Sequence, residues 1–249
     1  YSGYGINPVG SYVKEFDIPA DWGNKQIFLN FGGIYSAAYV WVNGQYVGYT
    51  QGANNDHEFD ITTQSRIGKN RLAVQVFRWS DGSYLECQDM FRMSGLYRDV
   101  IVFATPKTFV RDHYITADLD ENAGYTTGNM NIKLAVNNRS EQASTVKVNI
   151  ELFDPDGKSV YKFPEQTVSE LALGQEKELS FEAELDGLQL WSAEIPALYT
   201  VLISLSDASG QEQEAFSTKY GFRKIEQKGM FIYINGRKVF FKGANRHDT

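Results

Sequence analysis

The sequence predicts an all-β protein, because hydrophobic residues alternate along it and turn residues separate the alternating runs. Residues 26–31, 129–136 and 145–152 each alternate between side chains suited to a core and side chains suited to water. A period of two is typical of a strand with one buried face. Asn43-Gly44 and Asn235-Gly236 each stand between two such runs and favour the positive φ angles of a tight hairpin turn. No segment shows sustained helical periodicity with caps, so we expect two β-sandwiches.

The 249 residues are enough for two domains of ordinary size. Thr105-Pro106-Lys107 marks the expected boundary. Beyond it, strands of even length recur at short intervals up to Gly221-Phe222-Arg223, which suits an immunoglobulin-like sandwich. From Lys224 a last stretch passes through the Asn235-Gly236 hairpin and stops shortly after a β-run. That run would lack a partner and residue 1 is not Met, so we expect the chain to be a piece of a longer protein.

Composition bears on which partners the chain has. A net charge of −7 with scattered Lys and Arg argues against a nucleic-acid partner. No apolar run approaches the roughly 20 residues that span a bilayer, so no membrane partner is expected. The single Cys87 excludes an intrachain disulfide, which fits a reducing compartment without excluding the periplasm. Localisation therefore stays open between cytoplasm and periplasm.

The segment RWSDGSYLECQDMFRMSGLYRDV (78–100) is the densest candidate for function. It places carboxylates, arginines and aromatic side chains in one long connection between strands, and long polar connections are often functional. Local interpretations compete with this one. Asp81-Gly82 is also typical of a turn, and Arg92 with Asp89 or Glu86 is equally suited to a structural ion pair.

This run resembles the signature of the bacterial β-galactosidases of glycoside hydrolase family 2. Four other stretches resemble the same enzymes, in the same order and spacing: NPVGSYVKEF (7–16), YVWVNGQYVGYTQGANNDHEFDIT (39–62), LWSAEIPALYTV (190–201) and VFFKGANRHDT (239–249). The resemblance covers essentially the whole chain. It implies a jelly-roll, sugar-binding-type domain over 1–106, an immunoglobulin-like β-sandwich over 107–223 and the start of a (β/α)₈ catalytic barrel over 224–249, with VFFKG as the first barrel strand.

The resemblance also implies roles for individual residues. Asp81 is expected to bind a sodium ion and galactose hydroxyls, while His247 contacts the galactosyl ring and Asn245 and Arg246 line the site. The chemistry is reasonable, because hard cations prefer oxygen ligands and charge-assisted hydrogen bonds orient hydroxyls. A barrel site lies at the carboxyl ends of the strands, where NRHD would stand. For His247 the plain alternative is a surface histidine near a chain end.

No catalytic residue can be assigned in this chain. A retaining glycosidase uses two carboxylates about 5–5.5 Å apart, and the resemblance places both on later barrel strands, together with a magnesium site. The intact enzyme is expected to hydrolyse terminal β-D-galactosides as a homo-oligomer, and this portion alone is expected to be inactive. The short connection LALGQEK (171–177) departs from relatives whose longer loop completes a neighbouring subunit's site, which puts that form of assembly in doubt.

Two other functions compete with the enzyme-portion hypothesis. Trp41, Tyr46 and Tyr49 suit a free-standing carbohydrate-binding module, because aromatic faces stack on sugar rings. Aromatic residues make up 14% of the chain, however, and they also fill β-sandwich cores. A structural tandem sandwich explains the alternating strands but leaves the 78–100 segment and NRHD without a role.

Overall fold

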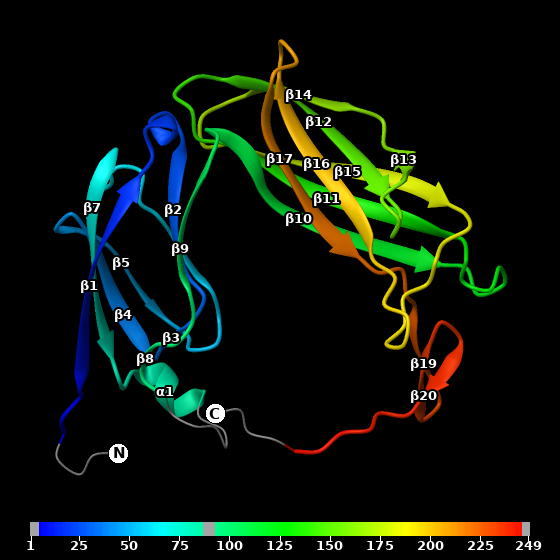
Figure 1. Ribbon diagram of the computed structural model, residues 1–249, viewed down its shortest axis with the longest axis horizontal. Coiled ribbons are helices and arrows are strands. Elements are labelled where there is room, and N and C mark those ends of the chain that lie inside the picture. The colour runs from blue at the N-terminus through cyan, green and yellow to red at the C-terminus, as the bar shows by residue number, and fades with distance from the viewer. Residues whose placement is uncertain (1–4, 87–92, 246–249) are drawn as a thin grey trace. The chain divides into compact units, whose positions relative to one another are not determined.

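The computed structural model describes residues 5–86 and 93–245. The chain forms two compact units, and their boundary in the sequence lies between Pro106 and Lys107 (Figure 1). The first unit takes residues 1–106 together with the chain end from Ala244, and the second takes Lys107–Gly243. Each unit has its own buried apolar cluster. Almost all regular structure is β, as predicted.

One sheet of the first unit has the strand order β1-β7-β4-β5. Its strands are antiparallel: β1 (Val9–Ile18), β7 (Gly68–Phe77), β4 (Ala37–Val42) and β5 (Gln45–Gln51). Asn43 and Gly44 have φ angles of 52° and 81°, which confirms the predicted tight turn between β4 and β5. Val40 and Val74 lie on the inner face and are buried.

The opposing sheet of the first unit has the order β6-β2-β9, made of β6 (His57–Asp60), β2 (Gln26–Phe31) and β9 (Val100–Thr105). The prediction of one buried face is wrong for β2. Leu29 and Phe31 are completely buried, yet Phe28 on the other face is also only 7% exposed. Phe28 stacks on Phe103 of β9, with ring centroids 5.3 Å apart, so a neighbouring aromatic covers the face that was expected to meet water.

Short elements complete the first unit: the 3₁₀ turn η1 (Ala20–Trp22), β3 (Ile34–Tyr35) paired with β8 (Gly95–Leu96), and the helix α1 (Asp81–Leu85). The helix α1 is short and leaves the predicted all-β class unchanged. Five residues are too few to show helical periodicity, so the pattern could not reveal it. Asp81-Gly82, for which a turn was the local alternative, opens this helix.

The second unit is a sandwich of two antiparallel sheets (Figure 1). One sheet has the order β10-β11-β15, with β10 (Thr108–Leu119), β11 (Gly128–Asn138) and β15 (Glu176–Leu185). In the other, β12 (Ser144–Phe153) pairs with β13 (Ser159–Lys162), β14 (Gln166–Leu171) and β16 (Tyr199–Asp207), and β16 pairs with β17 (Glu212–Tyr220). Alternate residues of β11 and β12 are buried, as predicted.

A small three-stranded sheet ends the second unit: β18 (Ile225–Lys228), β19 (Phe231–Ile234) and β20 (Arg237–Val239). It is tied to the β10–β11 turn. The Tyr125 hydroxyl donates to Glu226 Oε2 at 2.8 Å, and Lys228 Nζ lies 2.7 Å from Glu121 Oε1. Asn235 has a φ of 50°, so the predicted hairpin turn is confirmed. The strand β20 ends at Val239, and the barrel strand expected over 239–243 stays a prediction.

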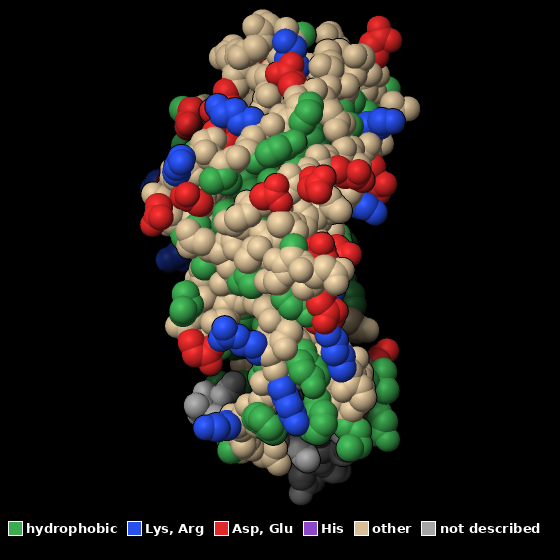
Figure 2. Space-filling model, turned by 90° about the vertical axis from the view of Figure 1, so that its right-hand side faces the viewer, with side chains coloured by type: hydrophobic (Ala, Val, Ile, Leu, Met, Phe, Trp, Pro, Cys, Tyr) green, Lys and Arg blue, Asp and Glu red, His purple; other side chains and the backbone are tan. Residues whose placement is uncertain are grey.

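Charged side chains are mixed on the surface. On the face drawn in Figure 2, lysine and arginine side chains are scattered among acidic ones. Among the described residues, no helix is long and apolar enough to span a bilayer. The absence of a nucleic-acid partner stays a prediction.

Candidate functional site

Asp81 is exposed and opens the helix α1, four residues after the end of β7 at Phe77. Hydrogen bonds between the Asn7 side chain and the Trp79 backbone hold the chain just before Asp81. Asn7 Nδ2 donates to the Trp79 carbonyl at 2.8 Å, and Asn7 Oδ1 accepts from the Trp79 amide at 3.0 Å. The Ser80 amide then donates to Ser83 Oγ at 3.0 Å, which helps α1 to begin at Asp81. The carboxylate of Asp81 is thus presented to solvent from an anchored backbone.

The loop between β5 and β6 is fastened to the far end of α1. Glu86 Oε2 accepts from the buried Ala53 amide at 3.0 Å, and the Tyr97 hydroxyl donates to the Ala53 carbonyl. His57 Nε2 donates to the Gly52 carbonyl at 2.7 Å. Its Nδ1 therefore accepts from the Thr50 hydroxyl at 2.6 Å. His57 and Glu86 are both engaged in holding this loop.

We expect Glu86→Ala to lower the free energy of unfolding of the first unit by about 1–3 kcal/mol, because it leaves the buried Ala53 amide without an acceptor. Glu86→Gln keeps an acceptor oxygen at this position and is expected to retain most of that stability. Urea unfolding followed by circular dichroism measures the difference. Equal losses in the two variants would show that the charge of Glu86, rather than its acceptor oxygen, stabilises the loop.

Tyr49 of β5 lies within electrostatic range of Asp81. Partial burial raises the pKa of the Tyr49 phenol, and the neighbouring Tyr39 phenol and Asp81 carboxylate raise it further. The Tyr49 hydroxyl, which like any phenol is protonated at neutral pH, donates to Gln51 Oε1 at 2.8 Å.

The remaining predicted site residues lie at the chain end. Asn245 is exposed, stands outside the helices and strands, and belongs to the same compact unit as Asp81. Within the described ranges, no hydrogen bond or ion pair joins Asn245 to Asp81. Arg246 and His247 lie outside the described residues, as do Asp89 and Arg92. Their predicted roles stay predictions.

The donor set near Asp81 supplies only part of a metal site. In the part of the chain that the structure describes, no three His, Cys, Asp or Glu residues are grouped to hold a metal ion. The exposed Asp81 carboxylate is a suitable single oxygen ligand for a hard cation. A sodium ion on Asp81 would need its other ligands from elsewhere.

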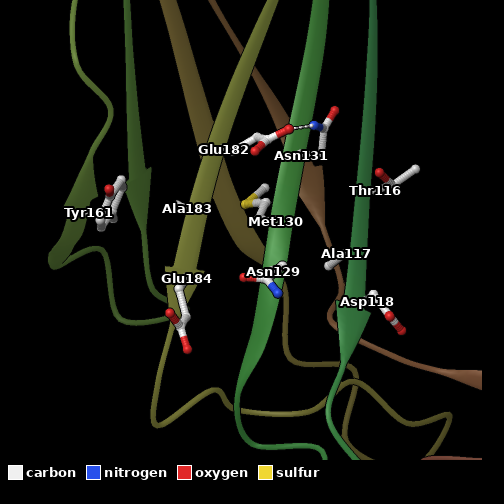
Figure 3. Close-up of a pocket in the computed structure, with 10 residues that line it drawn as sticks. All are labelled: Thr116, Ala117, Asp118, Asn129, Met130, Asn131, Tyr161, Glu182, Ala183 and Glu184. Carbon is white, nitrogen blue, oxygen red and sulfur yellow. Dashed lines mark hydrogen bonds between the residues drawn. The ribbon is translucent and has the colours of Figure 1, made fainter.

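A polar hollow of about 670 Å³ lies on the sheet β10-β11-β15 of the second unit (Figure 3). Two cross-strand rows supply its polar side chains, Thr116–Asn131–Glu182 and Asp118–Asn129–Glu184. Asn131 Nδ2 donates to Glu182 Oε1 at 3.0 Å and to Ser180 Oγ at 3.2 Å, while Asp118 pairs with Lys224 Nζ at 2.9 Å. Within the two rows, Asn131 and Glu182 are therefore bonded to each other, while the partner of Asp118 lies outside them.

Sequence reasoning missed this hollow, although it placed Asn129 and Asn131 on the water-facing side of a strand. Alternation indicates which residues share a face of one strand. It does not indicate that β15 pairs with β11 in a register that sets Glu182 and Glu184 beside the two asparagines.

Comparison with protein families covers nearly the whole chain. Residues 4–106 match the model described as glycosyl hydrolases family 2, sugar binding domain. Residues 108–223 match the model described as glycosyl hydrolases family 2.

Solved structures agree in fold. The β-glucuronidase 2 of Bacteroides uniformis superposes with a TM-score of 0.88 over 97% of this chain and 30% of that chain, at 24% identity. A family 2 glycosyl hydrolase from Bacteroides cellulosilyticus gives 0.82 over 94% of this chain and 31% of that chain, at 25% identity.

Curated relatives are closer in sequence. The β-galactosidase of Priestia megaterium is 37% identical over 243 residues, which is 97% of this chain and 23% of the relative. Those of Halalkalibacterium halodurans and Clostridium acetobutylicum are each 38% identical over 242 residues, 97% of this chain and 23% and 26% of the relatives. The chain thus spans about a quarter of the length of these relatives. With both of its sandwich units matched to the same family, the chain belongs to glycosyl hydrolases family 2.

Proposed function

We propose that this chain is the non-catalytic, amino-terminal portion of a retaining β-galactosidase that hydrolyses terminal β-D-galactosides. The observation that carries the proposal is the match of 97% of the chain, at 37–38% identity, to about a quarter of each of three β-galactosidases. Its sandwich units shape and support a site whose chemistry is performed by the remainder of the enzyme.

Within that enzyme, Asp81 is the contribution of the first unit to substrate binding. An exposed carboxylate on an anchored backbone can accept hydrogen bonds from galactosyl hydroxyls and offer one oxygen to a sodium ion. Asn245, Arg246 and His247 are proposed to contact the same sugar. Magnesium is proposed to bind in the remainder of the enzyme, and the intact protein is proposed to be a homo-oligomer.

The two catalytic carboxylates are proposed to lie in that remainder as well. Retention requires an acid/base and a nucleophile on either side of the scissile bond. Glu86, the carboxylate at the other end of α1, already accepts from the buried Ala53 amide, and a group held for loop structure is poorly suited to act as nucleophile. The chain alone is therefore expected to be inactive.

A chimera tests this proposal. The chain replaces the matching segment of the Priestia megaterium β-galactosidase, and hydrolysis of a chromogenic β-galactoside is compared with that of the unmodified relative and of the 249-residue chain alone. We expect the chimera to be active and the chain alone to be inactive. Hydrolysis by the chain alone would contradict the non-catalytic role. A soluble chimera that assembles like the relative but does not hydrolyse the substrate would contradict the proposed place of the chain.

A further inference from the structure

An apolar groove of about 440 Å³ lies along one side of the first unit. It is lined by β1 and β7 of one sheet, by β9 of the opposing sheet and by Leu96 of β8. In the described part of the chain, β1 and β9 are edge strands of their sheets, so the groove runs between two sheet edges. We call it the β1–β9 groove. Apart from Lys14, all of its lining residues are apolar or aromatic.

The core-facing side of β1 is left uncovered in this groove. Tyr12 and Lys14 pair with Val74 and Leu72 of β7, and directly paired residues share a face of the sheet. Val74 and Leu72 belong to the buried core, so Tyr12 and Lys14 are on the core-facing side as well. Tyr12 is nevertheless 41% exposed, and Lys14 is also exposed. The opposing sheet has three strands where this one has four, so it is too narrow to cover β1.

The strand β9 offers the place where a fourth strand can be added. It pairs with β2 on one side, and its other edge is not paired with any strand of the described residues. Val102 packs against the core, and Val100, two residues earlier, points to the same side, lines the groove and is 39% exposed. A strand hydrogen-bonded to this free edge would lie about 4.8 Å beyond β9, where it would cover the exposed side of β1.

We propose that a β-strand from the remainder of the enzyme fills the β1–β9 groove by hydrogen bonding to the free edge of β9. The inference rests on the proposed function, since the chain spans 23% of its Priestia megaterium relative and about three quarters of that polypeptide lies outside the match. The six residues of β9 can pair with a strand of similar length, roughly 20 Å. Such a strand carries apolar residues at every second position, because alternate side chains point into the groove.

A strand matches both features of this side of the unit. It covers the apolar surface and also pairs the backbone groups of β9, which an exposed edge leaves open to association. A small apolar molecule would fill the same volume but would leave the edge of β9 unpaired. The free edge therefore distinguishes a strand from other apolar occupants.

Hydrogen–deuterium exchange of β9 tests the proposal in the chimera of this chain with the Priestia megaterium enzyme. Only alternate amides of β9 bond to β2, so the others are expected to exchange quickly in the 249-residue chain alone. We expect these amides to exchange about 100-fold more slowly in the chimera. Amides of β11, which is paired on both sides, are the control and are expected to exchange equally in both proteins.

The exchange result is independent of catalysis. Fast exchange of β9 in a folded chimera would overturn the inference, even if that chimera hydrolyses a β-galactoside. Slow exchange of β9 in an inactive chimera would support the inference while contradicting the proposed function.

Val100→Asp and Ile101→Asp form a matched pair of substitutions. Val100 points into the groove, whereas Ile101, 51% exposed, is its neighbour on the opposite face of β9. A carboxylate is costly inside a filled apolar groove, so Val100→Asp is expected to restore fast exchange of β9 in the chimera. Ile101→Asp is expected to keep the exchange slow. In the chain alone, both variants are expected to unfold in urea at nearly the parent concentration, because both positions meet water there.

A milder substitution covers the case in which the chimera carrying Val100→Asp does not assemble. Val100→Ala removes part of the apolar contact without adding a charge and is expected to speed the exchange of β9 about 10-fold. Exchange that stays slow in both variants would show that the groove is not the docking surface. If a second copy of the chain were the occupant, β9 would already be protected in the chain alone, and this protection would rise with concentration together with the mass measured by light scattering. That result would overturn the assignment to the remainder of the enzyme.

Discussion

Phe222→Ala is expected to lower the free energy of unfolding of the second unit by about 3–5 kcal/mol. Phe222 is completely buried, and its ring packs edge-on against those of Tyr199 and Tyr220, with centroids 4.8 and 5.1 Å away. Its carbonyl also accepts from the Trp191 amide at 2.8 Å. Removing the ring leaves a cavity where β16, β17 and the 189–191 segment meet, and rigid neighbouring rings cannot close it easily.

Chemical denaturation of the chain measures this loss of unfolding free energy, and the unfolding of the two units is followed separately. Because each unit has its own core, only the transition of the second unit is expected to move. Phe240→Ala is the matched control, since that ring is 73% exposed and its loss is expected to cost less than about 0.5 kcal/mol. Equal losses in the two variants would mean that Phe222 does not contribute through the core.

The strands of the second unit were predictable because local pattern and tertiary burial agree there. In β11, Met130, Ile132 and Leu134 alternate with polar residues and are all buried. In β2 the two disagree, because Phe103 of β9 covers the outer face. A strand's own sequence contains no information about what a partner strand places beside it. The turns at Asn43 and Asn235 depend on local backbone preference alone, and both were predicted correctly.

The candidate site was only partly predictable for a similar reason. Asp81 was identified from a motif, and the structure shows it exposed at the start of a short helix. The contacts that anchor its surroundings join residues far apart in sequence. Asn7 reaches Trp79, and Glu86 reaches Ala53. Such pairings follow from how β1, β5 and β7 are laid together, which periodicity does not reveal.

Asp81→Asn in the active chimera is expected to lower kcat/KM for a β-galactoside about 100-fold, or about 2.7 kcal/mol of transition-state stabilisation. Asparagine keeps the shape of the side chain and one oxygen but removes the charge, so hydrogen bonds to the sugar hydroxyls weaken. A cation held by that oxygen loses its electrostatic attraction as well. The sodium concentration for half-maximal activity is therefore expected to rise in the same variant.

A measurement of stability distinguishes the proposed role of Asp81 in binding from a purely structural role. Because Asp81 is exposed, its substitution is expected to leave the thermal unfolding temperature of the chimera nearly unchanged. Asp21→Asn, at an exposed aspartate in η1, is the control for loss of one negative charge and is expected to keep full activity. A fall in activity with no change in sodium dependence would assign Asp81 to the sugar alone. Unchanged activity would remove Asp81 from the site, and the first unit would then act only through the surfaces that support the remainder of the enzyme.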